Sequence, residues 1–282
     1  MYYLFRIFYA MASLKILSKL WPLVYYLDFF RKKIVFKNLN IAFPEKPKKE
    51  KVKIAKNTYK NFLTFFENTI DFKKHPEKLD EIDVIGEEYI LKALNSDRPI
   101  ILVTAHFGNW EIAPKVIYRR YKKPMAVIMR EIENPKINKF FKKIRGDENI
   151  KLINKKGSSR EIVKSLLREK RILGILIDQN TNSSTAMKVN FFIPDTPFNP
   201  AVSKLAKSLR AVVIPGFSYK KDGKYVIEFK DIREFTKNDT VEEFTQWQAD
   251  VIEDMIKHYP DQYYWFHNRW KKVKVQDAKS AQ

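Results

Sequence analysis

The sequence predicts an α/β fold: a mixed, largely parallel central sheet flanked by helices, with an N-terminal hydrophobic membrane-anchoring helix. Short apolar, β-branched segments alternate with amphipathic segments along the chain, which is typical of such a sheet covered on both faces. Hydrophobic residues make up 45% of the 282 residues, enough for a substantial core. We expect a membrane-associated helix and basic flank over residues 1–35 and one α/β domain over residues 36–282.

The expected elements follow one another in a regular order after residue 50. Helical periodicity covers residues 50–72, and a short strand and a helix share residues 82–94. Apolar runs of strand length occupy residues 99–105, 125–129, 151–153, 172–177, 211–217 and 225–229. Helices are expected at 116–121, 134–144, 158–169, 200–209 and 241–259.

The first 30 residues are rich in aromatic and aliphatic side chains, and only four of them carry a charge: Arg6, Lys15, Lys19 and Asp28. A spanning helix needs about 20 mainly apolar residues, and no window of that length here lacks a lysine. The pattern favours an amphipathic or marginally spanning anchor, with the basic residues 31–33 against an anionic membrane face. The alternative is a buried helical hairpin broken at Pro22.

Composition excludes several classes of protein. The net charge of +21 indicates anionic partners: nucleic acid, a phospholipid surface or an acidic carrier protein. The absence of cysteine excludes disulfides, thiolate metal sites and an acyl-cysteine intermediate. Seven scattered glycines form neither a dinucleotide fingerprint nor a P-loop. Serine-hydrolase and zinc-protease motifs do not occur, and no two histidines have metal-ligand spacing, so we expect no metal and no cofactor.

The segment around His106 carries the chemistry. His106 ends the buried strand 99–105, Gly108 permits a sharp turn, and Glu111 follows five positions after the histidine. On one continuous helix that spacing separates the two side chains by about 140°, so a contact between them requires a break. Pro114 then requires a helix that starts late, near Ala113, or one that is kinked. A carboxylate that fixes the imidazole tautomer suits His106 to accept a proton from a hydroxyl group. The alternative is a structural histidine beside a surface glutamate.

Two further candidates follow other strands. Arg130 and Asp178, like His106, stand at the carboxyl ends of predicted strands, where ligands gather in open α/β sheets. Arg130 has the chemistry to stabilise an oxyanion or bind a phosphate, and Asp178 to orient a neighbour or cap a turn. The C-terminal run around Arg269 and Lys271 mixes aromatic residues with cations, which suits base stacking, a membrane interface or a lipid-phosphate site.

These pieces together resemble the late acyltransferases of lipid A biosynthesis (lauroyl/myristoyl acyltransferase type), a branch of the lysophospholipid acyltransferase superfamily. The resemblance extends from about residue 30 to 272. Its motifs are Asn38-Leu39, Phe43-Pro-Glu45, the His-x4-acid box His106 to Glu111, Arg130, Arg145, Asp178-Gln179, Phe191-Phe192 and Trp265-x-His267-x-Arg269-x-Lys271.

The resemblance implies a membrane-bound O-acyltransferase that moves a fatty acyl group from an acyl carrier protein thioester to a hydroxyl of a lipid A precursor, on the cytoplasmic face of the bacterial inner membrane. By that analogy His106 is the general base and Glu111 orients it. The residues implied to bind substrate or stabilise the oxyanion are Arg130, Asp178, Arg145, Arg269 and Lys271. Lipid A biosynthesis makes this a protein of lipopolysaccharide and lipid metabolism.

Three other functions compete with this one. A sister enzyme with the same chemistry would act on another glycolipid or on a lysophospholipid. A basic nucleic-acid-binding protein would also explain the charge, but the cations are spread over the chain and no nucleic-acid motif occurs, so we expect no nucleic-acid partner. A catalytically silent membrane scaffold would keep the anchor without needing the His-Glu pair.

Overall fold

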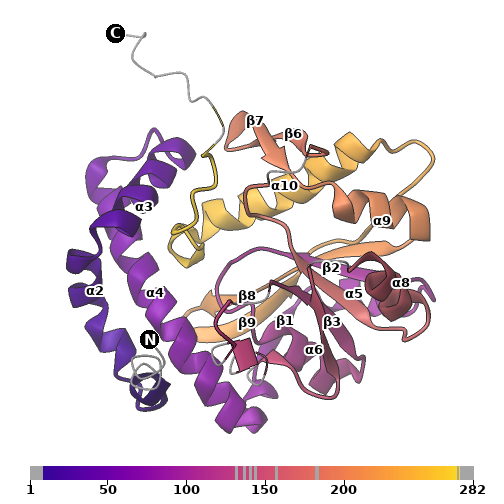
Figure 1. Ribbon diagram of the computed structural model, residues 1–282, viewed down its shortest axis with the longest axis horizontal. Coiled ribbons are helices and arrows are strands. Elements are labelled where there is room, and N and C mark those ends of the chain that lie inside the picture. Colours follow the sequence, from indigo (N-terminus) through magenta and orange to yellow (C-terminus); the bar gives the residue numbers. More distant parts are fainter. Residues whose placement is uncertain are drawn as a thin grey trace.

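The computed structural model describes residues 9–130, 133–135, 138–139, 142, 145–155, 158–181, 184–271 and 273. Its centre is a mixed sheet whose strands run in the order β1-β9-β8-β2-β5-β3-β4, with β10 paired to β8 (Figure 1). All neighbours on this path pair in parallel except β8 and β9. The strands are β1 (Asp83–Ile85), β2 (Ile100–Thr104), β3 (Met125–Met129), β4 (Ile150–Asn154), β5 (Ile172–Leu176), β8 (Val212–Lys221), β9 (Lys224–Phe229) and β10 (Arg233–Glu234). The predicted mixed, largely parallel sheet is therefore confirmed.

Helices cover both faces of the sheet. On one face, α5 (Glu87–Leu94) and α6 (Ala113–Tyr121) pack against it. On the other lie α8 (Ser159–Leu167), α9 (Ala201–Leu209) and α10 (Val241–His258). Strand β2 shows how both faces of the sheet are buried. Ile100 and Leu102 pack in the core beneath α5 and α6, and Ile101 and Val103 pack in the core on the opposite face. This alternation buries β2 on both sides and places its carboxyl end at the centre of one sheet edge.

Among the described residues, three helical segments lie between Leu17 and Ala42, in and just beyond the region where a single anchoring helix was predicted. These are η1 (Leu17–Leu20), α2 (Trp21–Leu27) and α3 (Phe29–Ala42). Pro22 lies in the first turn of α2, and the chain breaks at Asp28, whose side chain accepts a hydrogen bond from the Arg31 N–H and caps α3. None of the helices in the described residues is both long and apolar enough to cross a membrane. The predicted domain boundary at residue 35 falls inside α3.

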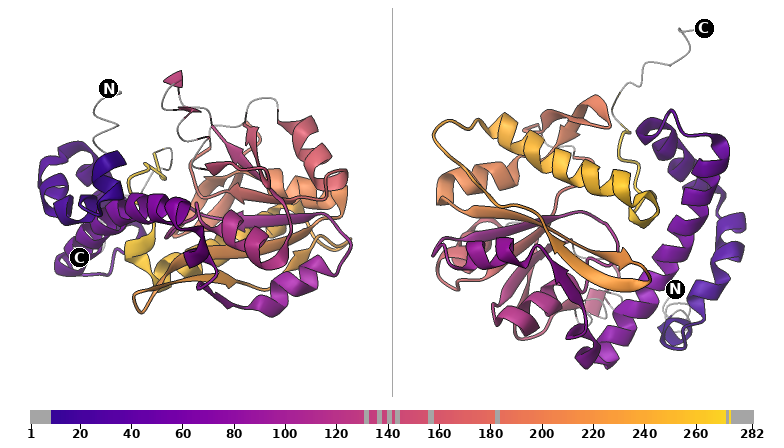
Figure 2. Two further views of the ribbon diagram at one scale, coloured as in Figure 1. Left: turned by 90° about the horizontal axis from the view of Figure 1, so that it is seen from below. Right: turned by 180° about the vertical axis from the view of Figure 1, so that it is seen from behind.

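The long helix α4 (Lys48–Lys74) connects this N-terminal unit to the rest of the molecule. It runs beside α2 and α3 along one side of the fold, and the C-terminal loop that follows α10 passes between α4 and the sheet domain (Figures 1 and 2). Residues of α3 and α4 therefore lie close to the C-terminal loop, next to the carboxyl end of β2.

Most predicted elements agree with the structure within a few residues, including the helix over 50–72 and the strand and helix of 82–94. The hairpin β6 (Met187–Phe191) and β7 (Ile193–Phe198), which packs on α10, was not predicted. Its strand β7 contains Pro194 and Pro197, and prolines within a run argue against predicting a strand there. The predicted helix over 134–144 lies largely outside the described residues.

Candidate active site

Strands β2 and β5 bring His106 and Asp178 together. The strands are parallel neighbours, and the Ile177 N–H donates to the Thr104 carbonyl oxygen at 3.2 Å, which continues the pairing beyond β5. Just beyond this hydrogen bond the two strands bring two polar side chains together: His106 Nδ1 lies 2.8 Å from Asp178 Oδ1. The predicted convergence of these two strand ends is confirmed.

The charge on Asp178 determines the tautomer of His106. The Asp178 side chain is only 2% exposed. Burial alone would raise its pKa, but the charge of His106 and the hydrogen bond to it outweigh this, and the pKa of Asp178 lies below its usual value. An ionised carboxylate can only accept, so the proton sits on Nδ1 of His106. When the ring is neutral, the other nitrogen, Nε2, offers its lone pair, and the Gln179 side-chain amide nitrogen lies 3.2 Å from it.

The chain leaves His106 through a backbone conformation that only glycine adopts easily. Gly108 has φ +56°, its N–H donates to the Gln262 carbonyl oxygen at 2.8 Å, and the next N–H donates to the Ser218 carbonyl oxygen at 2.8 Å. A Cβ atom on Gly108 would lie 2.0 Å from that same Ser218 oxygen. The backbone after His106 is thus held between β8 and the C-terminal loop, without room for a side chain.

Gly108→Ala is expected to lower the free energy of unfolding by about 2 kcal/mol or more, because a left-handed alanine costs about 1–2 kcal/mol before any clash is counted. The matched control is Gly223→Ala. Gly223 also has a positive φ, +83°, but a Cβ there meets nothing within 4 Å, so the loss should be about 1 kcal/mol. Urea unfolding measures both, and equal losses for the two variants would contradict the close approach at Ser218.

Glu111 does not hold the imidazole in this structure, so the predicted His106–Glu111 contact is wrong. The Nδ1 position is taken by Asp178, and Glu111 Oε1 accepts from Arg145 Nε at 2.8 Å and from Arg145 Nη2 at 2.7 Å. The physical reason is that residues 107 and 108 pair with Tyr263 and Ser218 before the chain turns into α6. That helix begins at Ala113 with Pro114 in its first turn, as the first of the two alternatives predicts.

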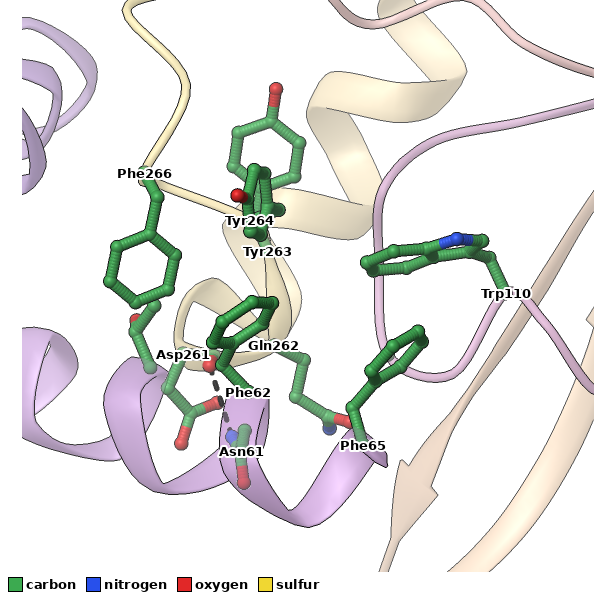
Figure 3. Close-up of a pocket in the computed structure, with 11 residues that line it drawn as sticks. Asn61, Phe62, Phe65, Trp110, Asp261, Gln262, Tyr263, Tyr264 and Phe266 are labelled. Atoms are coloured by element: carbon green, nitrogen blue, oxygen red, sulfur yellow. Dashed lines mark hydrogen bonds between the residues drawn. The ribbon is translucent and has the colours of Figure 1, made fainter. Parts of the chain in front are cut away.

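Aromatic rings surround the imidazole. The Trp110 ring lies edge-on to His106 at 5.1 Å between centroids, and the Tyr264 ring lies 6.0 Å away. Trp110 in turn stacks on Phe65 of α4 at 4.4 Å. Beside them is a small pocket of about 20 Å³, room for about one water, lined mainly by α4, residues 108–110 and the C-terminal loop (Figure 3). The His106 side chain is 22% exposed, so the site has an apolar wall and an open side.

Helix α3 holds the C-terminal loop in place beside His106. The amide nitrogen of Asn38, a side chain that is 1% exposed, donates to the carbonyl oxygens of Trp265 at 2.8 Å and His267 at 2.7 Å. Phe43 packs edge-on to Trp265 at 5.9 Å. The Tyr264 N–H donates to the His106 carbonyl oxygen at 2.9 Å. Motifs more than 200 residues apart in the sequence therefore form one contiguous wall of the site.

The remaining predicted site residues are scattered. Arg130 is exposed at the carboxyl end of β3, next to β5, and Lys271 is exposed in the C-terminal loop. Arg269 is 1% exposed, its Nη2 donates to the Pro197 carbonyl oxygen at 2.8 Å, and its Nε and Nη1 are buried without a protein partner. A guanidinium enclosed in this way cannot touch a substrate in this structure, which corrects the substrate contact expected for Arg269.

Sequence reasoning missed the contacts of Gln179, Trp110 and Tyr264 with His106. Each of them lies next to or within a motif that was recognised, but neither hydrogen bonding nor ring packing can be read from the spacing of residues. The run Tyr263 to Phe266 signalled an aromatic segment, and only the pairing of residue 107 with Tyr263 shows which ring faces the imidazole.

Comparisons with known proteins point to one family. A family model described as "Bacterial lipid A biosynthesis acyltransferase" matches residues 3–272. A lipid A biosynthesis acyltransferase of Haemophilus influenzae is 28% identical over 202 residues, which are 71% of this chain but 61% of that protein's length. A lipid A biosynthesis lauroyltransferase of Escherichia coli is 25% identical, covering 86% of this chain and 79% of that protein. A phosphatidylinositol mannoside acyltransferase of Mycolicibacterium smegmatis is 22% identical, covering 68% and 63%.

Proposed function

Because this chain belongs to the bacterial lipid A biosynthesis acyltransferase family, we propose that it transfers a fatty acyl group from an acyl carrier protein thioester to a hydroxyl group of a lipid A precursor. One observation carries this function: His106 at the end of β2 has its Nδ1 hydrogen-bonded to the ionised Asp178 and its Nε2 on the partly exposed side. A neutral imidazole arranged in this way is a general base for an alcohol.

The reaction follows from these contacts. The acceptor hydroxyl replaces the Gln179 amide at Nε2 and gives its proton to His106 as its oxygen attacks the thioester carbonyl carbon. Asp178 stabilises the imidazolium that forms, at a buried position where its charge acts strongly. The carbon–sulfur bond then breaks, and the departing thiolate takes the proton back from His106. No acyl-enzyme forms, and the chain's own residues supply all the proton transfers.

A cation is needed where negative charge develops on the thioester oxygen. Arg130 stands at the end of β3, one strand beyond Asp178. We keep Arg130 as the residue proposed for this oxyanion or for an acceptor phosphate. Arg145 is already engaged by Glu111, so its proposed part is to hold that segment of the site wall. The net charge of +21 favours an acidic carrier protein and a phosphorylated acceptor.

We propose that the protein acts at the cytoplasmic face of the bacterial inner membrane. Of the ten large hydrophobic side chains that are strongly exposed among the described residues, eight lie between residues 14 and 30. We call these eight the docking surface: Leu14, Ile16, Leu23, Val24, Tyr26, Leu27, Phe29 and Phe30. Exposed lysines lie within this segment at 19 and just after it at 33. Exposed apolar side chains gathered in one short segment that also carries cations fit an anionic phospholipid surface, with the apolar side chains below the headgroups.

The double variant Phe29→Ser with Phe30→Ser is expected to bind phosphatidylglycerol-containing vesicles at least about tenfold more weakly, because two side chains that are 65% and 87% exposed lose their transfer into lipid. Vesicle sedimentation measures the binding. The matched control is Leu91→Ser with Leu167→Ser, the two strongly exposed hydrophobic residues outside the docking surface, and it should bind like the wild type. Equal losses in both double variants would show that the docking surface is not the contact.

Supplying the purified protein with an acyl-loaded carrier protein and a lipid A precursor tests the function. Mass spectrometry should find the acceptor heavier by one acyl group. A second acceptor class deserves the same assay, because one similar protein is a phosphatidylinositol mannoside acyltransferase. Acylation of a mannosylated phospholipid and not of the lipid A precursor would replace the proposed acceptor while keeping the chemistry. No transfer to either acceptor would refute both.

A further inference from the structure

Arg31 is an exposed cation with most of its hydrogen-bonding capacity unused. Its Nη1 donates to the Phe266 carbonyl oxygen at 3.1 Å, which is the one hydrogen bond that its guanidinium makes among the described residues. The adjacent acid, Asp28, uses its oxygens on the Arg31 backbone N–H at 2.9 Å and on the Tyr59 hydroxyl at 2.8 Å. A guanidinium has five N–H donors. Arg31 therefore keeps its charge and several donors for a ligand.

The carbonyl that fixes Arg31 belongs to the loop that forms the wall of the active site. Tyr264, two residues before Phe266, faces the His106 ring, and His267 comes directly after Phe266. Burial raises the pKa of Tyr264, and the charge of Arg31 opposes that rise. Burial lowers the pKa of His267, where the charges of both His106 and Arg31 act in the same direction. The carbonyl that holds Arg31 therefore lies two residues from Tyr264, whose ring faces His106 and whose N–H donates to the His106 carbonyl oxygen.

On its other side Arg31 borders the docking surface. Phe29 and Phe30 immediately precede it in the first turn of α3 and are 65% and 87% exposed. Seven residues further along the same helix, Asn38 also binds the loop through the Trp265 and His267 carbonyls. Seven residues are about two helical turns, so both side chains extend from one face of α3. Helix α3 therefore exposes two apolar rings at its start and holds a cation against the C-terminal loop.

We propose that Arg31 binds a phosphate group of the acceptor lipid and so holds the acceptor hydroxyl in front of His106 while the acceptor's hydrocarbon stays at the docking surface. This proposal rests on the proposed function. Arginine suits the task because its planar fork binds phosphate oxygens in pairs, and such charge-assisted bonds are about twice as strong as neutral ones. A lipid at the interface presents its phosphate at the same depth as a cation that borders the apolar surface.

Steady-state kinetics in neutral detergent micelles test this, with a lipid A precursor and its dephosphorylated form as acceptors. Arg31→Gln should raise the acceptor KM about tenfold to a hundredfold and leave the carrier-protein KM unchanged. With the dephosphorylated acceptor, Arg31→Gln and wild type should have the same KM. The matched control is Lys37→Gln, an exposed cation on the same helix, and it should behave like the wild type with both acceptors. Arg31→Lys should recover part of the loss.

Each other outcome has a definite meaning. An equal rise in KM with the dephosphorylated acceptor, or an unchanged KM with both acceptors, overturns the phosphate contact. Weaker sedimentation of Arg31→Gln with phosphatidylglycerol vesicles and an unchanged KM in micelles would assign Arg31 to bulk phospholipid phosphate, which also overturns it. Wild-type turnover is measured first. No turnover with either acceptor refutes the proposed function and the Arg31 proposal together. If the wild type turns over, the proposed function stands, and the KM values of the variants then test the role of Arg31 alone.

Discussion

His106→Ala is expected to lower kcat for acyl transfer by about 10²–10⁴-fold, because the reaction loses the base that accepts the hydroxyl proton. The variant also leaves the Asp178 carboxylate, which is 2% exposed, without its hydrogen-bond partner, so it should unfold at a lower urea concentration than the wild type. Its kcat is therefore measured at a temperature at which thermal unfolding shows the variant to be folded. The loss should appear in kcat more than in either KM, since His106 acts on the proton that moves in the transition state.

His258→Ala is the control for His106→Ala. His258 lies in the last turn of α10, its side chain is 65% exposed, and its Nδ1 contacts the Asp254 carbonyl oxygen one turn earlier. Removing it should leave kcat unchanged. Full activity of purified His106→Ala on a lipid A precursor would refute the general-base assignment.

Asp178→Asn is expected to lower kcat by about 10²–10⁴-fold while leaving both KM values close to those of the wild type. The amide can donate to Nδ1, which moves the imidazole proton to Nε2 and blocks the nitrogen that should accept the hydroxyl proton. The charge that stabilises the imidazolium is lost in the same substitution. Single-turnover measurements with the acyl-loaded carrier protein separate this chemical step from substrate binding.

Glu111→Gln is the informative comparison for Asp178→Asn. Its amide oxygen still accepts from Arg145, in place of a carboxylate that is 13% exposed, so the loss in kcat should be below about tenfold. Thermal unfolding checks that both variants are folded, which matters most for Asp178 because its carboxylate is buried. A larger loss of kcat in Glu111→Gln than in Asp178→Asn would return the orienting role to Glu111.

The sequence predicts much of this site because strand ends can be read from it. His106 follows a mostly apolar run and Asp178 a fully apolar one, and parallel strands that alternate with helices bring such ends to one edge. Their contact follows from topology. The choice between Asp178 and Glu111 does not, because a separation of five residues is compatible with contact or with none. The pairing of residues 107 and 108 with the C-terminal loop and β8 decides it, and these partners are more than 100 residues away.

The sequence pattern also does not predict which single polar side chains are buried. Lys271 and Arg269 alternate with aromatic residues in one run, yet the first is exposed and the second is enclosed between Phe191 and Phe198 at 5.3 and 5.1 Å. The N-terminal segment shows the same limit. Its composition predicts apolar helices, but the cap at Asp28 that divides them depends on the Tyr59 hydroxyl of α4.

The hydrogen bonds from Asn38 to the Trp265 and His267 carbonyls join residues separated by 227 and 229 positions. During synthesis the N-terminal helices leave the ribosome long before the loop that they hold, and every strand of the sheet is synthesised before that loop. The candidate site therefore depends on one of the last segments to be synthesised, and a chain that stops short of its final aromatic run contains His106 and Asp178 but has one wall of the site missing.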